Sequence, residues 1–205
     1  MGYKGTNFSL KDEETALLTD LSFFEKKQEL SKKIIGFLGD LEAEYFEITR
    51  PFYDVLPPEI QHKRGKISKG ENYRGLPYFI LDAPAVFDKN SILAYRSLVW
   101  WGHPFTATFH LSGRFMEQYI ERLFPKLKLL DQSAMICINR NSWEHHMQRD
   151  NYIPILEFLE SNNYSREFFT EQGFLKVAIP VDVHKSTEWK TRGIEFLGNI
   201  LTLLR

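Results

Sequence analysis

Two adjacent uncharged runs near the middle of the chain constrain the fold most strongly. Residues 97–113 contain no Asp, Glu, Lys or Arg, the longest such stretch in the 205 residues. Residues 92–101 and 105–112 are rich in β-branched and aromatic side chains, and a short Gly-His-Pro sequence joins them. This pattern predicts an antiparallel hairpin of two buried strands. Because the stretch includes polar side chains and falls short of about 20 apolar residues, we expect no transmembrane segment.

Helical periodicity dominates the two ends of the chain, and strand patterns dominate its middle. We expect one α+β domain over residues 1–205, with helices packed on an antiparallel or mixed sheet, because no regular strand–helix alternation occurs. Its parts are a helical segment at about 10–49, a sheet-rich middle at about 66–139 and a helix–strand–helix segment at about 152–204. The expected helices are 10–18, 22–48, 114–124 and 187–204, with two more centred near 157 and 168; the further strands are 76–82, 133–139 and 174–183.

Charge and cysteine content indicate the compartment and exclude some partners. The chain has 26 basic and 27 acidic residues, whereas nucleic-acid binding usually needs a basic excess. We therefore expect no nucleic-acid partner. Cys137 is the only cysteine and cannot form an internal disulfide, and residues 1–6 lack the apolar segment of a secretory signal. Both features indicate a reducing cytoplasm.

The strand at 105–112 carries the candidate catalytic residue. Alternation places Thr106, Thr108, His110 and Ser112 on one face of this strand. The imidazole of His110 titrates near neutral pH, so it is the candidate proton donor or acceptor. Ser112 precedes the expected helix, whose free backbone N–H groups attract anions, and Arg114 would add a positive charge of suitable geometry.

Aromatic residues around the hairpin suggest a ligand with a planar group. Eleven aromatic residues fall among the 47 residues from 73 to 119, a density that suits either a planar-ligand pocket or a bulky sheet core. In the first case Tyr95 and Trp101 would stack on the ligand, and Arg74 would join Arg114 in holding negative charge. The predicted ligand-binding residues are Arg74, Tyr95, Trp101, Ser112 and Arg114.

Two other segments have weaker chemical signatures. Residues 143–146, Trp-Glu-His-His, with Asp150, Asp182 and His184 elsewhere, offer metal-ligand types, but their spacing fits no known metal motif. We therefore assign no metal. Residues 62–74 carry five basic residues against one acidic residue, which indicates a solvated loop more than a nucleic-acid surface. The chain also lacks phosphate-loop and dinucleotide-binding motifs.

Two functions remain open from these patterns. The first is binding of a small aromatic or anionic molecule in a pocket between sheet and helix, with acid–base or hydrolytic chemistry at His110. The alternative is a non-catalytic interaction module, in which the apolar helix at 187–204 contacts another subunit, for example in a homo-oligomer. The sequence does not decide whether the protein is an enzyme, and it indicates no cofactor.

Overall fold

Six α-helices and one seven-stranded sheet form the fold in the computed structural model, which describes residues 8–161 and 165–205. The α+β class and the single domain, with a long N-terminal helix and a C-terminal helix, are confirmed. The helices are α1 (Asp12–Leu18), α2 (Leu21–Thr49), α3 (Gly113–Leu123), α4 (Ile155–Glu160), α5 (Arg166–Gln172) and α6 (Ser186–Leu204). The strands are β1 (Lys66–Tyr73), β2 (Leu76–Phe87), β3 (Ile92–Trp100), β4 (Phe105–Ser112), β5 (Met135–Cys137), β6 (Tyr152–Pro154) and β7 (Phe174–Val181). Residues 1–6, on which the absence of a secretory signal rests, lie outside the described part.

The predicted hairpin lies at the centre of the sheet. The strand order is β1-β2-β3-β4-β7-β5-β6, and every pair of neighbours is antiparallel. In the β3–β4 pair, Tyr95 lies opposite Phe109, and Ala94 lies opposite His110. Because side chains alternate along a strand, this register places Tyr95 and His110 on opposite faces of the sheet.

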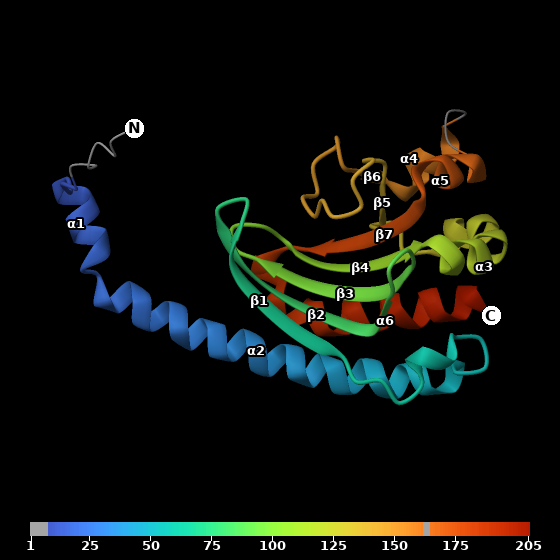
Figure 1. Ribbon diagram of the computed structural model, residues 1–205, viewed down its shortest axis with the longest axis horizontal. Coiled ribbons are helices and arrows are strands. Elements are labelled where there is room, and N and C mark those ends of the chain that lie inside the picture. The colour runs from blue at the N-terminus through green and yellow to red at the C-terminus, as the bar shows by residue number, and fades with distance from the viewer. Residues whose placement is uncertain (1–7, 162–164) are drawn as a thin grey trace, which may run out of the picture.

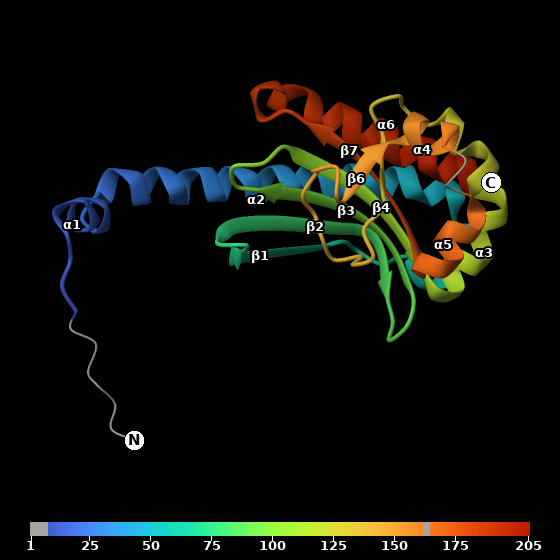
Figure 2. The ribbon, with the colours of Figure 1, turned by 90° about the horizontal axis from the view of Figure 1, so that it is seen from above.

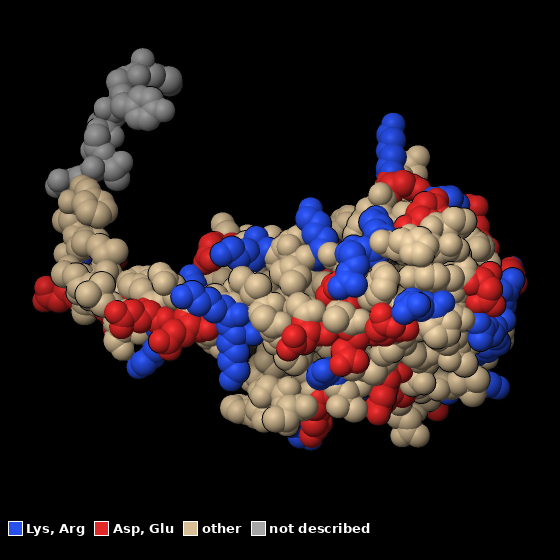
Figure 3. All heavy atoms as spheres, turned by 90° about the horizontal axis from the view of Figure 1, so that it is seen from below, with Lys and Arg blue, Asp and Glu red and all other residues tan. Residues whose placement is uncertain are grey.

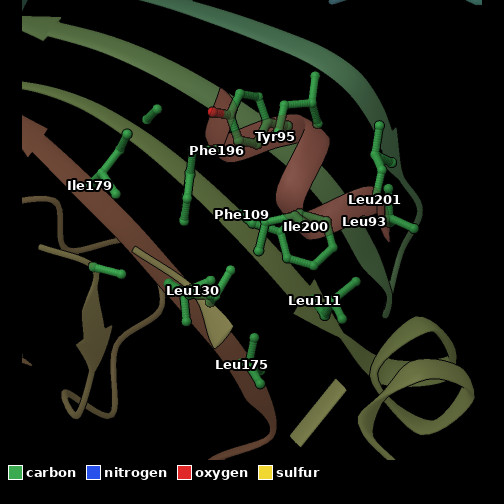
Figure 4. Packing of buried hydrophobic residues seen from close by; sticks show 14 of the residues in the cluster. Leu93, Tyr95, Phe109, Leu111, Leu130, Leu175, Ile179, Phe196, Ile200 and Leu201 are labelled. Carbon is green, nitrogen blue, oxygen red and sulfur yellow. The ribbon is translucent and has the colours of Figure 1, made fainter. Parts of the chain in front are cut away.

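The two long helices α2 and α6 cover one face of the sheet (Figures 1 and 2). On that face Phe109 and Tyr95 point toward Phe196 and Ile200 of α6 (Figure 4). The Tyr95 hydroxyl donates a hydrogen bond to the carbonyl of Gly193 at 2.6 Å, so burial leaves this polar atom satisfied. The apolar stripe of α6 is therefore part of the protein's own core.

Two strands were not predicted from the sequence. The basic stretch at 62–74, expected to be a loop, forms edge strand β1 over most of its length. Exposed charges are usual on edge strands, where they discourage pairing with other chains. The short strand β6, which was also not predicted, lies at the opposite edge. Within the described residues, no helix combines the length and apolar character needed to cross a membrane.

A close contact between α2 and α6 makes Gly193 sensitive to substitution. A Cβ atom at this position would lie 2.6 Å from the Tyr45 hydroxyl oxygen, which itself lies 3.0 Å from Ser97 Oγ. Overpacking costs about 1–3 kcal/mol, and replacing a helical glycine by alanine returns up to about 1 kcal/mol. We expect Gly193→Ala to lower the free energy of unfolding by roughly 1–2 kcal/mol in urea titration.

Gly198 in the same helix provides the control for this prediction. A Cβ atom at Gly198 would meet no atom within 4 Å. Gly198→Ala should therefore stabilise the protein by up to about 1 kcal/mol, because only the helix propensity changes. Equal effects of the two substitutions would contradict the proposed contact.

Candidate functional site: a polar cluster beneath a loop

The face of the sheet opposite α2 and α6 carries a row of polar side chains. Strand pairing places Asp82 opposite Arg96, and Arg96 opposite Thr108. In the next row His110 lies opposite Lys176 of β7. Side chains alternate between the two faces of a sheet, and paired residues point to the same face. The side chains of these five residues therefore lie on one face: Asp82, Arg96, Thr108, His110 and Lys176. Four neighbouring strands thus build a compact polar cluster at the centre of the sheet.

The loop from 138 to 151, between β5 and β6, covers this cluster. The Lys176 ammonium donates hydrogen bonds to the loop carbonyls of Ser142 at 2.8 Å and Glu144 at 2.6 Å. The Tyr73 hydroxyl donates to the Glu144 carboxylate at 3.1 Å and accepts from the His145 backbone N–H at 3.0 Å. These contacts hold the loop against the sheet and remove the cluster from water.

Arg96 and Asp82 form the ion pair at the centre of the cluster. The guanidinium donates from Nε to one carboxylate oxygen at 2.7 Å and from a terminal nitrogen to the other at 2.9 Å. Both side chains are largely buried. The other terminal nitrogen of Arg96 lies 3.3 Å from Nε2 of His145 in the loop. A two-bond pair of this kind fixes the guanidinium plane.

Burial shifts the pKa values of the basic side chains in the cluster. Lys176 is only 1% exposed, and desolvation lowers its pKa to about 8. Burial, together with the charges of Lys176 and Arg96, lowers the pKa of His110 to about 3. The same causes hold the pKa of His145 well below its usual value. At neutral pH both imidazoles are therefore neutral, while Lys176 remains mostly protonated.

A small cavity remains between the sheet and the loop. Its volume is about 10 Å³, which is space for about one water molecule. The Nε2 atom of His110 is buried and has no hydrogen-bond partner among the described residues. The cavity can therefore hold one water-sized molecule that hydrogen-bonds to His110. It is lined by Phe87, Ala94, Arg96, Thr108, His110, His145 and Lys176.

Only His110 of the predicted site residues lies in this cavity. Tyr95 and Trp101 belong to the helix-covered face, where Tyr95 is fully buried and contacts the rings of Tyr45 and Phe196. The predicted assembly of these aromatic residues with His110 in one pocket is wrong, because the sheet separates them. Alternation along one strand could not reveal this, since the separation depends on the β3–β4 register.

The predicted anion site at the start of α3 is filled by other parts of the chain. Arg114 extends to the surface and pairs with Glu59 at 2.7 Å and Asp88 at 3.3 Å. The backbone N–H of Arg114 donates to Ser91 Oγ at 3.2 Å, and the side chain of Ser112 makes no capping hydrogen bond. The predicted convergence of His110 and Arg114 on one ligand is therefore wrong.

Arg74 holds the loop from outside. Its guanidinium pairs with the Glu144 carboxylate at 2.7 Å and is about half exposed. The residues missed from the sequence are Lys176 and the covering loop with His145. A lysine within the apolar strand at 174–183 was the available signal for Lys176. Among the described residues, no group of three or more His, Cys, Asp or Glu side chains could hold a metal ion.

The fold and the site together define an α+β protein with a loop-covered basic cluster on its sheet. Comparisons with known protein families, with curated proteins and with solved structures found no match for this chain.

Proposed function

We propose that this protein binds a small anionic molecule, of carboxylate or phosphate type, beneath the 138–151 loop. The observation that carries the proposal is the state of Lys176. Its ammonium group is buried, yet its hydrogen-bond partners are two main-chain carbonyls. No carboxylate lies within ion-pair distance of it in the described part of the chain. An unpaired buried charge is costly, and such groups concentrate at functional sites.

Charge balance favours an anion as the ligand. Asp82 neutralises Arg96, and Arg74 neutralises Glu144. Both imidazoles are neutral at pH 7 because burial lowers the pKa values of His110 and His145. Lys176 therefore leaves the cluster with a net charge of about +1. A single anionic group beside Lys176 and the free Nε2 of His110 would balance this charge and satisfy both donors.

Ligand entry requires the loop to move. The cavity has space for about one water, and the carbonyls of Ser142 and Glu144 occupy the hydrogen-bonding positions around Lys176. A ligand's oxygen atoms would replace these carbonyls once the loop lifts. The 138–151 loop thus acts as a lid, a common device for closing a site against water.

The proposal is limited to binding. Burial lowers the pKa of His110 to about 3, and a base this weak is poorly matched to proton transfer at neutral pH. His110 therefore contributes a hydrogen bond to the ligand, in place of the acid–base role expected from the sequence. A reducing cytoplasm remains part of the proposal, supported by the buried free thiol of Cys137.

The alternative function, association through the C-terminal helix, loses its support. The apolar side chains of α6 pack against the sheet, α2 and α3, and eight residues of this helix are buried. These buried side chains therefore give no support to association through α6.

Thermal unfolding in the presence of simple anions tests the proposal. Phosphate, sulfate, acetate and benzoate are compared with chloride at constant ionic strength. An anion at ten times its Kd should stabilise the protein by about 1.4 kcal/mol, which is a rise in Tm of roughly 3–5 °C. Lys176→Met should abolish this rise, because the positive charge beside the cavity is gone.

Lys190→Met is the matched control, since Lys190 is a partly exposed lysine paired with Glu44 at 2.8 Å. This variant should keep the anion-dependent rise. The proposal fails if no anion raises the Tm of the parent protein, or if Lys176→Met responds as strongly as the parent.

A further inference from the structure

Two aromatic side chains beside the cavity of the polar cluster remain partly exposed to solvent. Phe87, at the end of β2, lines the cavity and is 43% exposed. Trp143, in the covering loop, is 49% exposed. Scattered exposed apolar residues are ordinary on protein surfaces, so the position of these two rings decides what they can do.

The Trp143 ring lies between the cavity and solvent. Its centroid is 6.1 Å from the centroid of the His110 ring, in an edge-to-face arrangement, and 5.7 Å from the guanidinium carbon of Arg96. His110 and Arg96 are largely buried and both line the cavity. Because about half of Trp143 is exposed, its ring covers these two cavity walls on their solvent side.

The position of Trp143 in the chain links its ring to Lys176. The residues on either side of it, Ser142 and Glu144, supply the two carbonyls that accept hydrogen bonds from the Lys176 ammonium group. An anion that replaces these carbonyls would therefore lie next to the segment that carries the Trp143 ring.

Phe87 approaches the same position from the sheet. Its partner in the strand pairing, Ile92, lies opposite Ser112. Ser112 and His110 are two residues apart on β4, so Phe87 and His110 share one face of the sheet. Phe87 and Lys176 line one cavity with space for about one water. A ligand anchored beside Lys176 would therefore meet one aromatic ring on the sheet side and another on the loop side.

Charge favours the same face of the molecule. On the side that carries α2, acidic and basic side chains are interspersed over the body (Figure 3). Beneath the loop, by contrast, the positive charge of Lys176 has no carboxylate partner within the described part of the chain. The charge of the cluster and the two exposed rings therefore favour one kind of ligand.

We propose that the anion bound at this site carries an aromatic ring, as an aryl carboxylate or aryl phosphate does, and that Trp143 and Phe87 contact this ring. The inference rests on the proposed binding of an anion beneath the 138–151 loop. The anionic group lies beside Lys176 and the free Nε2 of His110. The ring lies at the mouth of the site, where offset or edge-to-face contacts with the two aromatic side chains stabilise it.

Pairs of ligands that differ in the ring test this inference. Benzoate is compared with acetate, and phenyl phosphate with phosphate, through the shift in Tm at constant ionic strength. In any pair that binds, the aromatic member should bind at least about tenfold more tightly, because ring contacts and apolar burial add to the ionic interaction. Cyclohexanecarboxylate has a ring of similar size without π electrons and should bind more weakly than benzoate.

Substitution of the two rings tests the residues. Trp143→Ala and Phe87→Ala should each reduce the preference for benzoate over acetate by about threefold or more, whereas Trp143→Phe retains a ring and should keep most of it. Phe23→Ala is the matched control, because Phe23 is also 43% exposed but lies on α2. This variant should keep the preference of the parent protein. Circular dichroism checks that each variant is folded.

The outcomes separate this inference from the proposed function. If the parent protein binds benzoate and acetate equally well, the aromatic class is wrong, although the anion site stands. Equal binding of benzoate and cyclohexanecarboxylate would also overturn the aromatic class. Unchanged preference in both Trp143→Ala and Phe87→Ala would show that the ring binds elsewhere. If no anion binds at all, the proposed function itself fails, and this inference fails with it.

Discussion

Replacing Arg96 with alanine is expected to lower the free energy of unfolding by about 3–5 kcal/mol, because it leaves a buried carboxylate without its partner. The Asp82 side chain is only 11% exposed and accepts two hydrogen bonds from Arg96, at 2.7 and 2.9 Å. The Asp82 carboxylate would therefore lose both of these hydrogen bonds at once. The substitution would also remove the contact between the Arg96 guanidinium and His145 of the covering loop.

Urea unfolding at pH 7 measures this effect. The double variant Arg96→Met with Asp82→Leu removes both charges while keeping most of the volume, and we expect it to recover most of the lost stability. Arg50→Ala provides the surface comparison, since Arg50 pairs with Glu47 at an exposed position, and it should cost less than about 1 kcal/mol. A similar small loss for Arg96→Ala would show that the central pair is not shielded from water.

The second large effect is an acid sensitivity that originates at His110. Burial, with the charges of Lys176 and Arg96, lowers the pKa of His110 from 6.5 to about 3. Between these two values the unfolded chain binds a proton that the folded protein excludes, so stability falls as the pH decreases from 6.5 toward 3. At pH 4.5 this single group should cost about 2–3 kcal/mol relative to pH 7.

His110→Gln should remove that part of the loss. Measured by urea unfolding, the difference in stability between pH 7 and pH 4.5 should be about 2–3 kcal/mol smaller in the variant than in the parent. Comparing each variant with itself at two pH values separates this effect from any change in packing. His184→Gln is the control, because it removes an imidazole from an exposed position. This variant should keep the pH dependence of the parent protein. An unchanged pH dependence in His110→Gln would contradict the proposed burial.

The sequence predicted the elements of the fold well where periodicity was strong. The helices at 22–48 and 187–204 and the hairpin at 92–112 were recognised because their apolar residues repeat at helical or strand spacing. Edge strand β1 was missed because its exposed side chains show no apolar alternation. Its strand conformation depends on hydrogen bonds to β2, which are long-range information.

The candidate site was only partly predictable for a related reason. His110 could be placed from alternation within its own strand. Lys176 belongs to a strand that was recognised, but its burial depends on a loop with no periodic pattern. The separation of Tyr95 from His110 depends on how two strands are registered. Each of these properties arises from contacts between distant segments, which a pattern within one segment cannot encode.

The way in which Lys176 is held has an evolutionary consequence. The ammonium group contacts the main-chain carbonyls of Ser142 and Glu144, and every amino acid supplies such a carbonyl. Mutation of Ser142 would leave this anchorage intact, whereas Lys176 has no equivalent substitute. In descendants of this protein, the loop could diversify and adapt its outer surface to new molecules while the lysine beneath it stays fixed.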